Sequence, residues 1–175
     1  MKKDIAIFIS SVTGNTLKIA SRVKEEIEGK GYNIILKKFH DLEEVQCEAD
    51  LYILCFWCRR STLDDLSQRF VSKYKDQKIL AFGTMGNYPD SEYGDRVRKN
   101  VIEFINGQNK CEGVFLSRGK IPVKRTEYRR NLPKDHPHYL NEEGYKRHIE
   151  SRNHPNEDDM RNAVNFLNQY IADNF

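Results

Sequence analysis

Short apolar segments alternate with helix-like segments along most of the chain, and this alternation restricts the possible folds more than any other feature. Residues 5–9 form an apolar run without polar alternation, which is typical of a parallel strand buried on both faces. A predicted helix follows from residue 15, with apolar residues at helical spacing: Leu17, Ile19, Ala20, Val23 and Ile27. Gly29 and Gly31 end this pattern. The chain therefore begins with a strand, a loop and a helix.

The same alternation continues through the rest of the chain. We expect further strands over residues 32–39, 51–56, 78–83 and 113–117, and helices over residues 63–74, 95–105 and 157–172. Parallel neighbours need helical crossovers, and these are right-handed. The order predicts an α/β fold with a doubly wound, five-stranded parallel sheet, whose ligands bind at the carboxyl ends of the strands. The length suits one such domain, so we expect residues 1–175 to form a single domain.

Residues 119–155 interrupt the alternation, because they carry four prolines, many charges and little periodicity. The segment is too long for an ordinary connection, so we expect an insertion before the last helix that packs beside the ligand edge, with a short helix near residues 141–149. Residues 118–152 contain ten Lys and Arg against five Asp and Glu, although the net charge of the chain is only +3. Without regularly spaced aromatic residues, this charge favours an acidic partner or substrate, and we expect no nucleic-acid partner.

The loop after the first strand is rich in groups that bind anions. It comprises Ser10, Ser11, Val12, Thr13, Gly14, Asn15 and Thr16. Backbone N–H groups and the positive end of the helix dipole hold a phosphate at such a position, and hydroxyls donate further hydrogen bonds. The chain has neither the lysine frame of nucleoside-triphosphate loops nor the glycine pattern of dinucleotide-binding folds. The loop therefore predicts a site for a single phosphate, with an ordinary helix N-cap as the alternative.

The segment Ser11-Val12-Thr13-Gly14-Asn15-Thr16 resembles the flavodoxin phosphate-binding pattern [ST]-x-T-G-x-T. The predicted order of elements over residues 1–117 and the closing helix are also similar to the flavodoxin family. This resemblance implies that the chain binds FMN and uses it in redox chemistry. Flavodoxins that only shuttle electrons tend to be strongly acidic, whereas this chain is slightly basic and carries the insertion.

Two further loops would then border the flavin ring. The loop expected after the third strand contains Phe56, Trp57, Cys58 and Arg59. Trp57 could stack on the ring, and an arginine beside the ring would stabilise the reduced, anionic flavin. The loop expected after the fourth strand contains Thr84, Met85, Gly86, Asn87, Tyr88, Tyr93 and Gly94, whose backbone groups could bind the pyrimidine edge of the ring. The structural alternatives are a tryptophan at the edge of the core and arginines in solvent.

Cysteine and histidine spacing gives weaker indications. Cys55 and Cys58 have the spacing of a redox motif, but Cys55 falls within a predicted strand and should point into the core. The insertion holds four histidines that fit no zinc pattern, so we expect no metal site: His136, His138, His148 and His154. The four cysteines favour a reducing compartment, and no membrane span or signal peptide is visible. We therefore expect a cytoplasmic protein without a membrane partner.

Three functions are compatible with these features. In the first, the chain is an FMN-binding protein that transfers electrons to a redox partner protein, a reductase docked over the ring. In the second, it is an FMN-dependent reductase that acts directly on a small anionic substrate, for example a tetrapyrrole such as bilirubin. Flavodoxin-like accessory partners of bilirubin reductases carry a similar long segment, which is the basis of that example. In the third, the loop binds another mononucleotide without redox chemistry. The sequence indicates no catalytic residue, and it is compatible with a monomer or a homodimer.

Overall fold

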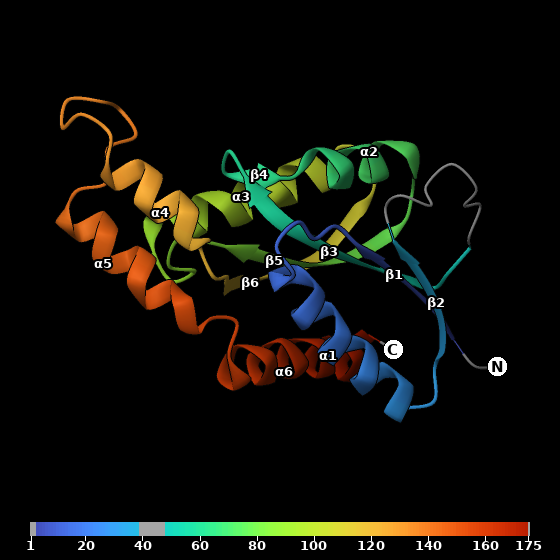
Figure 1. Cartoon of the computed structure of the whole chain (residues 1–175). Coiled ribbons are helices and arrows are strands. Elements are labelled where there is room, and N and C mark those ends of the chain that lie inside the picture. The colour runs from blue at the N-terminus through green and yellow to red at the C-terminus, as the bar shows by residue number, and fades with distance from the viewer. Residues whose placement is uncertain (1–2, 39–47, 175) are drawn as a thin grey trace.

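The computed structural model describes residues 3–38 and 48–174 (Figure 1). Five parallel strands form a sheet in the order β2-β1-β3-β5-β6, with these bounds: β1 (Asp4–Ile9), β2 (Asn33–Lys38), β3 (Leu51–Arg59), β5 (Lys78–Met85) and β6 (Lys110–Arg118). The short strand β4 (Thr62–Leu63) pairs antiparallel with the end of β3. The doubly wound α/β fold with five parallel strands is thus confirmed, and β4 is an addition that the sequence did not predict.

Helices cover both faces of the sheet. On one face lie α1 (Asn15–Gly29) and α6 (Glu157–Asn174), and on the other lie α2 (Asp65–Lys73) and α3 (Glu92–Asn106) (Figure 1). Successive strand residues alternate between two buried clusters, so that Ile5 and Ile7 pack with α1 and α6 while Ala6 and Phe8 pack with α2 and α3. Because both faces are buried, the strands read as unbroken apolar runs.

Three strands extend further than the sequence predicted. The register pairs Trp57 with Thr84 and Met85 with Arg118, so β3, β5 and β6 continue into polar sequence. Pairing persists because neighbouring strands satisfy the backbone there, whatever the polarity of the side chains. The expected loop residues 57–59 and 84–85 are therefore strand residues. Helices α2 and α3 also start elsewhere than expected, at Asp65 and Glu92, which places residues 93 and 94 in the first turn of α3. The strand expected over residues 32–39 spans Asn33–Lys38, and residue 39 lies outside the described residues.

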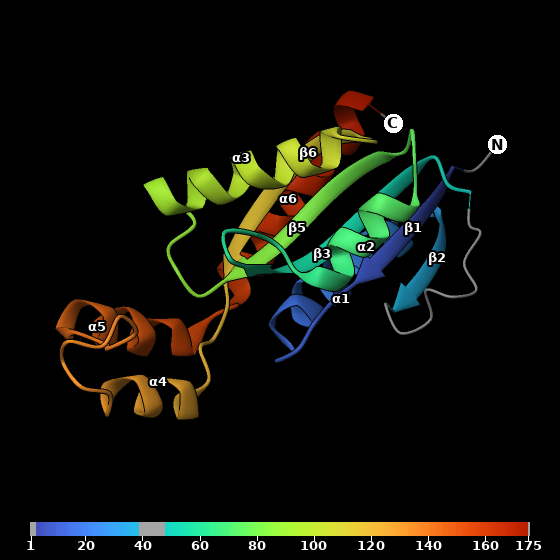
Figure 2. The same cartoon turned by 90° about the horizontal axis from the view of Figure 1, so that it is seen from above.

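The insertion folds into two helices and a short 3-10 turn: α4 (Val123–Arg130), α5 (Glu142–Glu150) and η2 (Ser151–Asn153). Figure 2 shows α4 and α5 side by side at one end of the molecule. Helix α5 confirms the predicted short helix, and Asn141 caps it by accepting a hydrogen bond from the Gly144 amide at 2.8 Å. The sequence did not predict α4, because only Thr126 of this helix is buried and no apolar stripe marks it.

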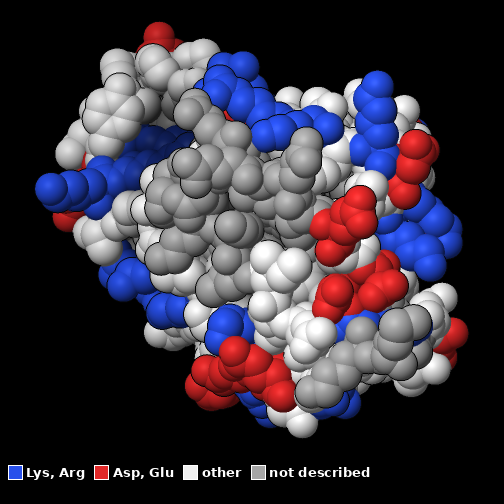
Figure 3. Space-filling model, turned by 90° about the vertical axis from the view of Figure 1, so that its right-hand side faces the viewer, with Lys and Arg blue, Asp and Glu red and all other residues white. Residues whose placement is uncertain are grey.

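The face of the molecule in Figure 3 carries both kinds of charge, and the described cysteines form no disulfide. On the face in Figure 3, the described basic and acidic side chains are interspersed. Within the described residues, no helix combines the length and apolar character needed to cross a membrane. Cys55, Cys58 and Cys111 are free thiols, and Cys47 lies outside the described residues.

Candidate functional site

Two adjoining cavities open at the carboxyl ends of β3 and β5. The small cavity, of about 280 Å³, lies over the first loop and the start of α1. The large cavity, of about 550 Å³, lies between the β3–β4 turn, the loop after β5, and helices α4 and α5. Both are lined by Trp57, Cys58, Met85, Gly86, Ile121 and Arg125. The shared lining makes the two cavities contiguous, at the edge where a doubly wound sheet binds its ligands.

The start of α1 has the geometry of an anion site. Gly14 is the N-cap, with a φ of 85° and no side-chain capping bond. A Cβ atom there would meet nothing within 4 Å, so the backbone conformation, and not crowding, favours glycine. The next two residues, Asn15 and Thr16, line the small cavity together with Thr13. The Leu17 amide of this first turn donates to the Ser11 hydroxyl at 3.2 Å. The start of a helix, with its N-terminal N–H groups and nearby hydroxyls, fits a phosphate group.

The hydroxyls of the first loop occupy different environments. Thr13 lines the small cavity, and its Oγ1 accepts a hydrogen bond from the Asn15 side-chain Nδ2 at 3.0 Å. Thr16 also lines this cavity, but its buried Oγ1 lies 2.7 Å from Thr84 Oγ1 and 3.3 Å from the Phe56 carbonyl oxygen. Ser10 is buried and donates its hydroxyl to Asp64 at 2.7 Å. Thr13 and Thr16 are therefore placed at the cavity, whereas Ser10 braces the loop from behind.

Asp64 joins the first loop to the end of β3 and the start of α2. Its carboxylate is 1% exposed and accepts hydrogen bonds from the hydroxyls of Ser10 and Ser67, each at 2.7 Å. It also accepts from the Trp57 amide at 3.3 Å, and it caps α2 through the amides of Leu66 and Ser67. Sequence reasoning missed this residue, because a lone Asp before a helix indicates only an N-cap.

The β3–β4 turn forms one wall of the large cavity. Arg60 and Ser61 have φ values of 51° and 63°, a left-handed pair that resembles a type I′ turn but uses neither Gly nor Asn. Asn100 donates to the Ser61 carbonyl at 2.9 Å and supports this turn. Arg59 and Arg60 line the cavity, and Arg59 also forms an ion pair with Asp65. Unusual backbone of this kind is common at functional sites.

The cysteines of the redox-like motif differ in position. Cys55 is fully buried in the core, whereas Cys58 lines both cavities. Burial raises the pKa of both thiols above the ordinary value, and at Cys58 a hydrogen bond with Tyr93 only partly offsets this rise. Both thiols are therefore protonated at neutral pH and lack the thiolate that redox and nucleophilic cysteines use. The core position predicted for Cys55 is confirmed.

The start of the insertion closes the other side of the small cavity. The Gly119 amide donates to the Met85 carbonyl at 2.8 Å, and the Asn15 side chain donates to the Lys120 carbonyl at 3.0 Å. Lys120 and Ile121 line this cavity. A Cβ atom on Gly86 would come within 2.9 Å of the Ile121 side chain, so any larger residue at position 86 would force that side chain to shift.

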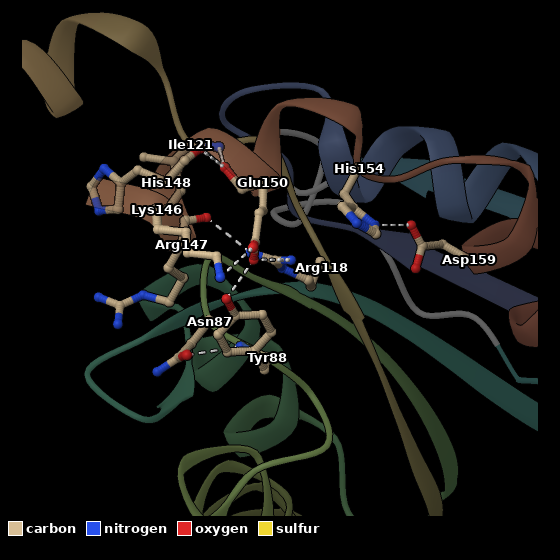
Figure 4. Close-up of polar contacts among 11 residues, drawn as sticks. Asn87, Tyr88, Arg118, Ile121, Lys146, Arg147, His148, Glu150, His154 and Asp159 are labelled. Carbon is tan, nitrogen blue, oxygen red and sulfur yellow. Dashed lines mark hydrogen bonds and ion pairs between the residues drawn. The ribbon is translucent and has the colours of Figure 1, made fainter. Parts of the chain in front are cut away.

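Glu150, at the end of α5, connects the insertion to the sheet (Figure 4). It accepts a hydrogen bond from the Tyr88 hydroxyl at 2.5 Å, which lowers the pKa of the Glu150 carboxyl. Arg118 lies 3.7 Å from the same carboxylate and 4.3 Å from the centre of the Tyr88 ring. Arg118 also donates to the Arg147 carbonyl at 2.9 Å. These contacts hold α5 beside the loop that follows β5.

Most of the predicted site residues line the two cavities: Val12, Thr13, Asn15, Thr16, Trp57, Cys58, Arg59, Thr84, Met85, Gly86, Asn87 and Tyr93. The others do not line them: Ser10, Ser11, Gly14, Phe56, Tyr88 and Gly94. Phe56 belongs to the core, and Tyr88 lines a separate cavity beside β6. Gly94 is buried against the preceding loop, where a Cβ atom would lie 1.9 Å from the Pro89 carbonyl oxygen.

Four Arg and His residues that α4 and α5 bring to the large cavity are absent from the predicted set of cofactor-binding residues: Arg125, Arg129, Arg147 and His148. All four belong to the insertion, far along the chain from the loops that the motif identified. The one sequence feature that points to them is the local excess of basic residues, which indicates a charge but not which side chains face a cavity.

The sheet order and the cavities at the carboxyl ends of its strands define a protein of the flavodoxin fold. A sequence model of the flavodoxin domain matches residues 6–168, so the chain belongs to the flavodoxin domain family. Membership of this family implies a flavin-binding redox protein.

Individual relatives agree with this assignment. The flavodoxin-like domain-containing protein BilS of Clostridioides difficile is 29% identical over 167 residues, which cover 91% of this chain and 92% of the relative. Oxidised flavodoxin 1 from Bacillus cereus has a TM-score of 0.59 at 14% identity and covers 97% of each chain. An NAD(P)H:quinone oxidoreductase from Methanothermobacter marburgensis has a TM-score of 0.53 at 10% identity, over 90% of this chain and 98% of that one. The two solved structures share the fold with this chain.

Proposed function

We propose that this chain binds FMN and transfers electrons from the reduced flavin to a partner reductase. The contiguous cavity, which runs from the start of α1 to the ends of β3 and β5, is the observation that carries this proposal. Thr13, Asn15 and Thr16 would hold the phosphate, and Trp57 would lie against the ring. Backbone groups of residues 86 and 87 would bind the pyrimidine edge. Bound flavin would supply the redox chemistry, and the chain would position it.

FMN is favoured over FAD, because the first loop offers one phosphate site at a helix N-terminus and lacks the glycine pattern that binds a pyrophosphate. Titration of the apoprotein with FMN, FAD and riboflavin tests this choice. Riboflavin has the same ring without the phosphate, so it should bind about tenfold or more weakly, which corresponds to the loss of one charge-assisted hydrogen bond. Equal affinities for FMN and riboflavin would remove the phosphate from the proposed site.

Direct reduction of a small anionic substrate, such as a tetrapyrrole of the bilirubin type, is the second candidate function. Helices α4 and α5 favour it, because they place three arginines in the large cavity. Anaerobic stopped-flow mixing of the reduced protein with bilirubin separates the two functions. Electron transfer to a partner predicts that the flavin stays reduced when bilirubin is the only acceptor. Reoxidation by bilirubin alone, at a rate proportional to its concentration, would favour the second function.

The domain extent, the location and the partners of the chain are part of the same proposal. We propose a single domain over residues 1–175, located in the cytoplasm, with a redox partner protein or a small anionic substrate and without nucleic acid. Free thiols in the described part of the chain suit a reducing compartment. Light scattering during size-exclusion chromatography should give the mass of one or two copies of the 20.6 kDa chain.

A further inference from the structure

Three arginines of the insertion line the large cavity without a carboxylate partner among the described residues. Arg125 and Arg129 lie one turn apart on α4, and Arg147 lies on α5. We call these residues the cavity arginines. In the described part of the chain, no Asp or Glu lines this cavity. Neighbouring cations are paired instead: Arg130 with Glu142, and both Arg118 and Lys146 with Glu150.

The charges of the cavity arginines act on Arg129 and on His148. Burial lowers the pKa of Arg129, and the charges of Arg125 and Arg147 lower it further. His148 lies on the same cavity wall, is 3% exposed, and has its Nδ1 atom 3.0 Å from the Thr126 hydroxyl. Its pKa falls to about 4, first through burial and then through the three arginine charges. A bound anion would offset this repulsion.

One of the cavity arginines is held by a hydrogen bond, and the two helices that carry them are joined to each other. The Arg129 Nε atom donates to the His138 carbonyl at 2.9 Å, which fixes one edge of its guanidinium group. The α4–α5 pair is joined by the Thr126–His148 hydrogen bond and by Arg130, whose guanidinium lies 4.7 Å from the centre of the Tyr145 ring. Positioned guanidinium groups match the planar, two-oxygen geometry of a carboxylate better than ammonium groups do.

The large cavity also has apolar lining. Trp57, Met85 and Ile121 line it together with the cavity arginines, and Arg59 and Arg60 of the β3–β4 turn add further positive charge, so the cavity combines apolar and cationic side chains. Its concave form and its volume of about 550 Å³ lie within the range of small-molecule sites, whereas a protein surface would dock on a flatter patch. The lining therefore favours a small organic acid with an apolar body over an acidic side chain of a protein.

We propose that Arg125, Arg129 and Arg147, together with His148, form a binding subsite for the carboxylate of a small apolar organic acid. The subsite lies beside the position of the flavin ring, and in that respect it rests on the proposed function. It assigns a substrate or effector class to the insertion and gives the second candidate function a defined recognition element.

Calorimetric titration of the full-length, FMN-loaded protein with 2-naphthoate and 2-naphthamide tests the subsite. The two probes share an apolar body and differ in charge, so naphthoate should bind about tenfold or more tightly than naphthamide. The double substitution Arg129→Gln with Arg147→Gln should abolish this preference and leave FMN affinity within about threefold, since the phosphate site lies on the other cavity. The matched control, Lys146→Gln with Arg152→Gln, removes the same charge outside the cavity and should keep the preference. If the double variant does not fold, Arg147→Gln alone should reduce it.

Several results would overturn the subsite. Equal affinities for the two probes, or no measurable binding of naphthoate, would do so directly. Equal losses in the cavity variant and the matched control would indicate diffuse attraction, which suits an acidic protein surface. Loss of FMN from the cavity variant would assign the arginines to the flavin site. Failure of the proposed function is a separate result, because a protein that binds no FMN can still prefer naphthoate through Arg129 and Arg147 in the same titration.

Discussion

Replacement of Asp64 by alanine should destabilise the protein more than any surface substitution near the cavities. The Asp64 carboxylate is 1% exposed and accepts five hydrogen bonds from four residues: Ser10, Trp57, Leu66 and Ser67. Alanine at residue 64 would remove the cap of α2 and leave two buried hydroxyls and one strand amide without this acceptor.

The expected loss in free energy of unfolding is about 3 kcal/mol. Loss of an N-cap costs about 1 kcal/mol, and each buried donor left unsatisfied costs about 1 kcal/mol or more. Ser10 and Ser67 are 3% and 0% exposed, so water does not readily replace the missing acceptor. Alanine also removes the buried charge of the Asp64 carboxylate, whose burial costs free energy, and this offsets part of the loss. The lower end of each range is therefore used.

Urea unfolding of Asp64→Ala and Asp65→Ala provides the measurement and its control. Asp65 is the next residue, carries the same charge and is exposed, with one ion pair to Arg59. Its substitution should cost less than about 1 kcal/mol. Since Asp64 also links the first loop to Trp57, its replacement should weaken FMN binding as well. Free energies of unfolding that differ by less than about 1 kcal/mol between the two variants would refute the role given to Asp64.

Three further outcomes follow from the contacts at the site. Thr13→Ala combined with Thr16→Ala should weaken FMN binding by about 1–3 kcal/mol for each hydrogen bond lost to the phosphate. The control Thr16→Ser keeps a hydroxyl and should bind FMN normally. Unchanged affinity of the double variant in a fluorescence titration would remove both threonines from the site. The pKa of His148 is about 4 in the folded state, below its ordinary value of 6.5, so the unfolded state binds more protons between these values. The stability from neutral His148 should thus be complete above pH 6.5 and fall by up to about 3 kcal/mol as the pH drops to 4, and urea unfolding of His148→Asn should lack this component. Tyr88→Phe should speed amide hydrogen exchange in α5, because it removes the hydrogen bond between Tyr88 and Glu150 that holds this helix. The control Tyr128→Phe changes an exposed residue of α4 and should leave the exchange rate unchanged. Equal exchange in both variants would contradict the role of Tyr88.

The fold could be predicted because hydrophobic burial leaves a direct trace in the sequence. Residues 5–9 are apolar on both faces of β1, and residues 19, 23 and 27 mark the buried stripe of α1. The ends of β3 and β5 could not be predicted, since Arg59 and Thr84 continue the sheet through backbone pairing that polarity does not reveal. Helix α4 was missed for a similar reason, because it packs chiefly through Thr126 and not through an apolar face.

The candidate site, like the fold, could be predicted only in part. The first loop could be found because its residues are consecutive and their chemistry suits a phosphate. The cavity arginines could not, because their convergence depends on how α4 and α5 return over the sheet. Asp64 was missed because its pattern indicates only an N-cap, and its partner Ser10 lies 54 residues away, where only the fold brings the two together.

Identification of the cofactor released by the purified protein tests the central claim most directly. We predict a yellow protein with one flavin per chain, whose visible absorption is bleached by dithionite and restored by an oxidant. Denaturation should release FMN, because the first loop has a site for one phosphate. A protein that releases FAD, or a colourless protein that cannot be reconstituted with FMN, would contradict this assignment.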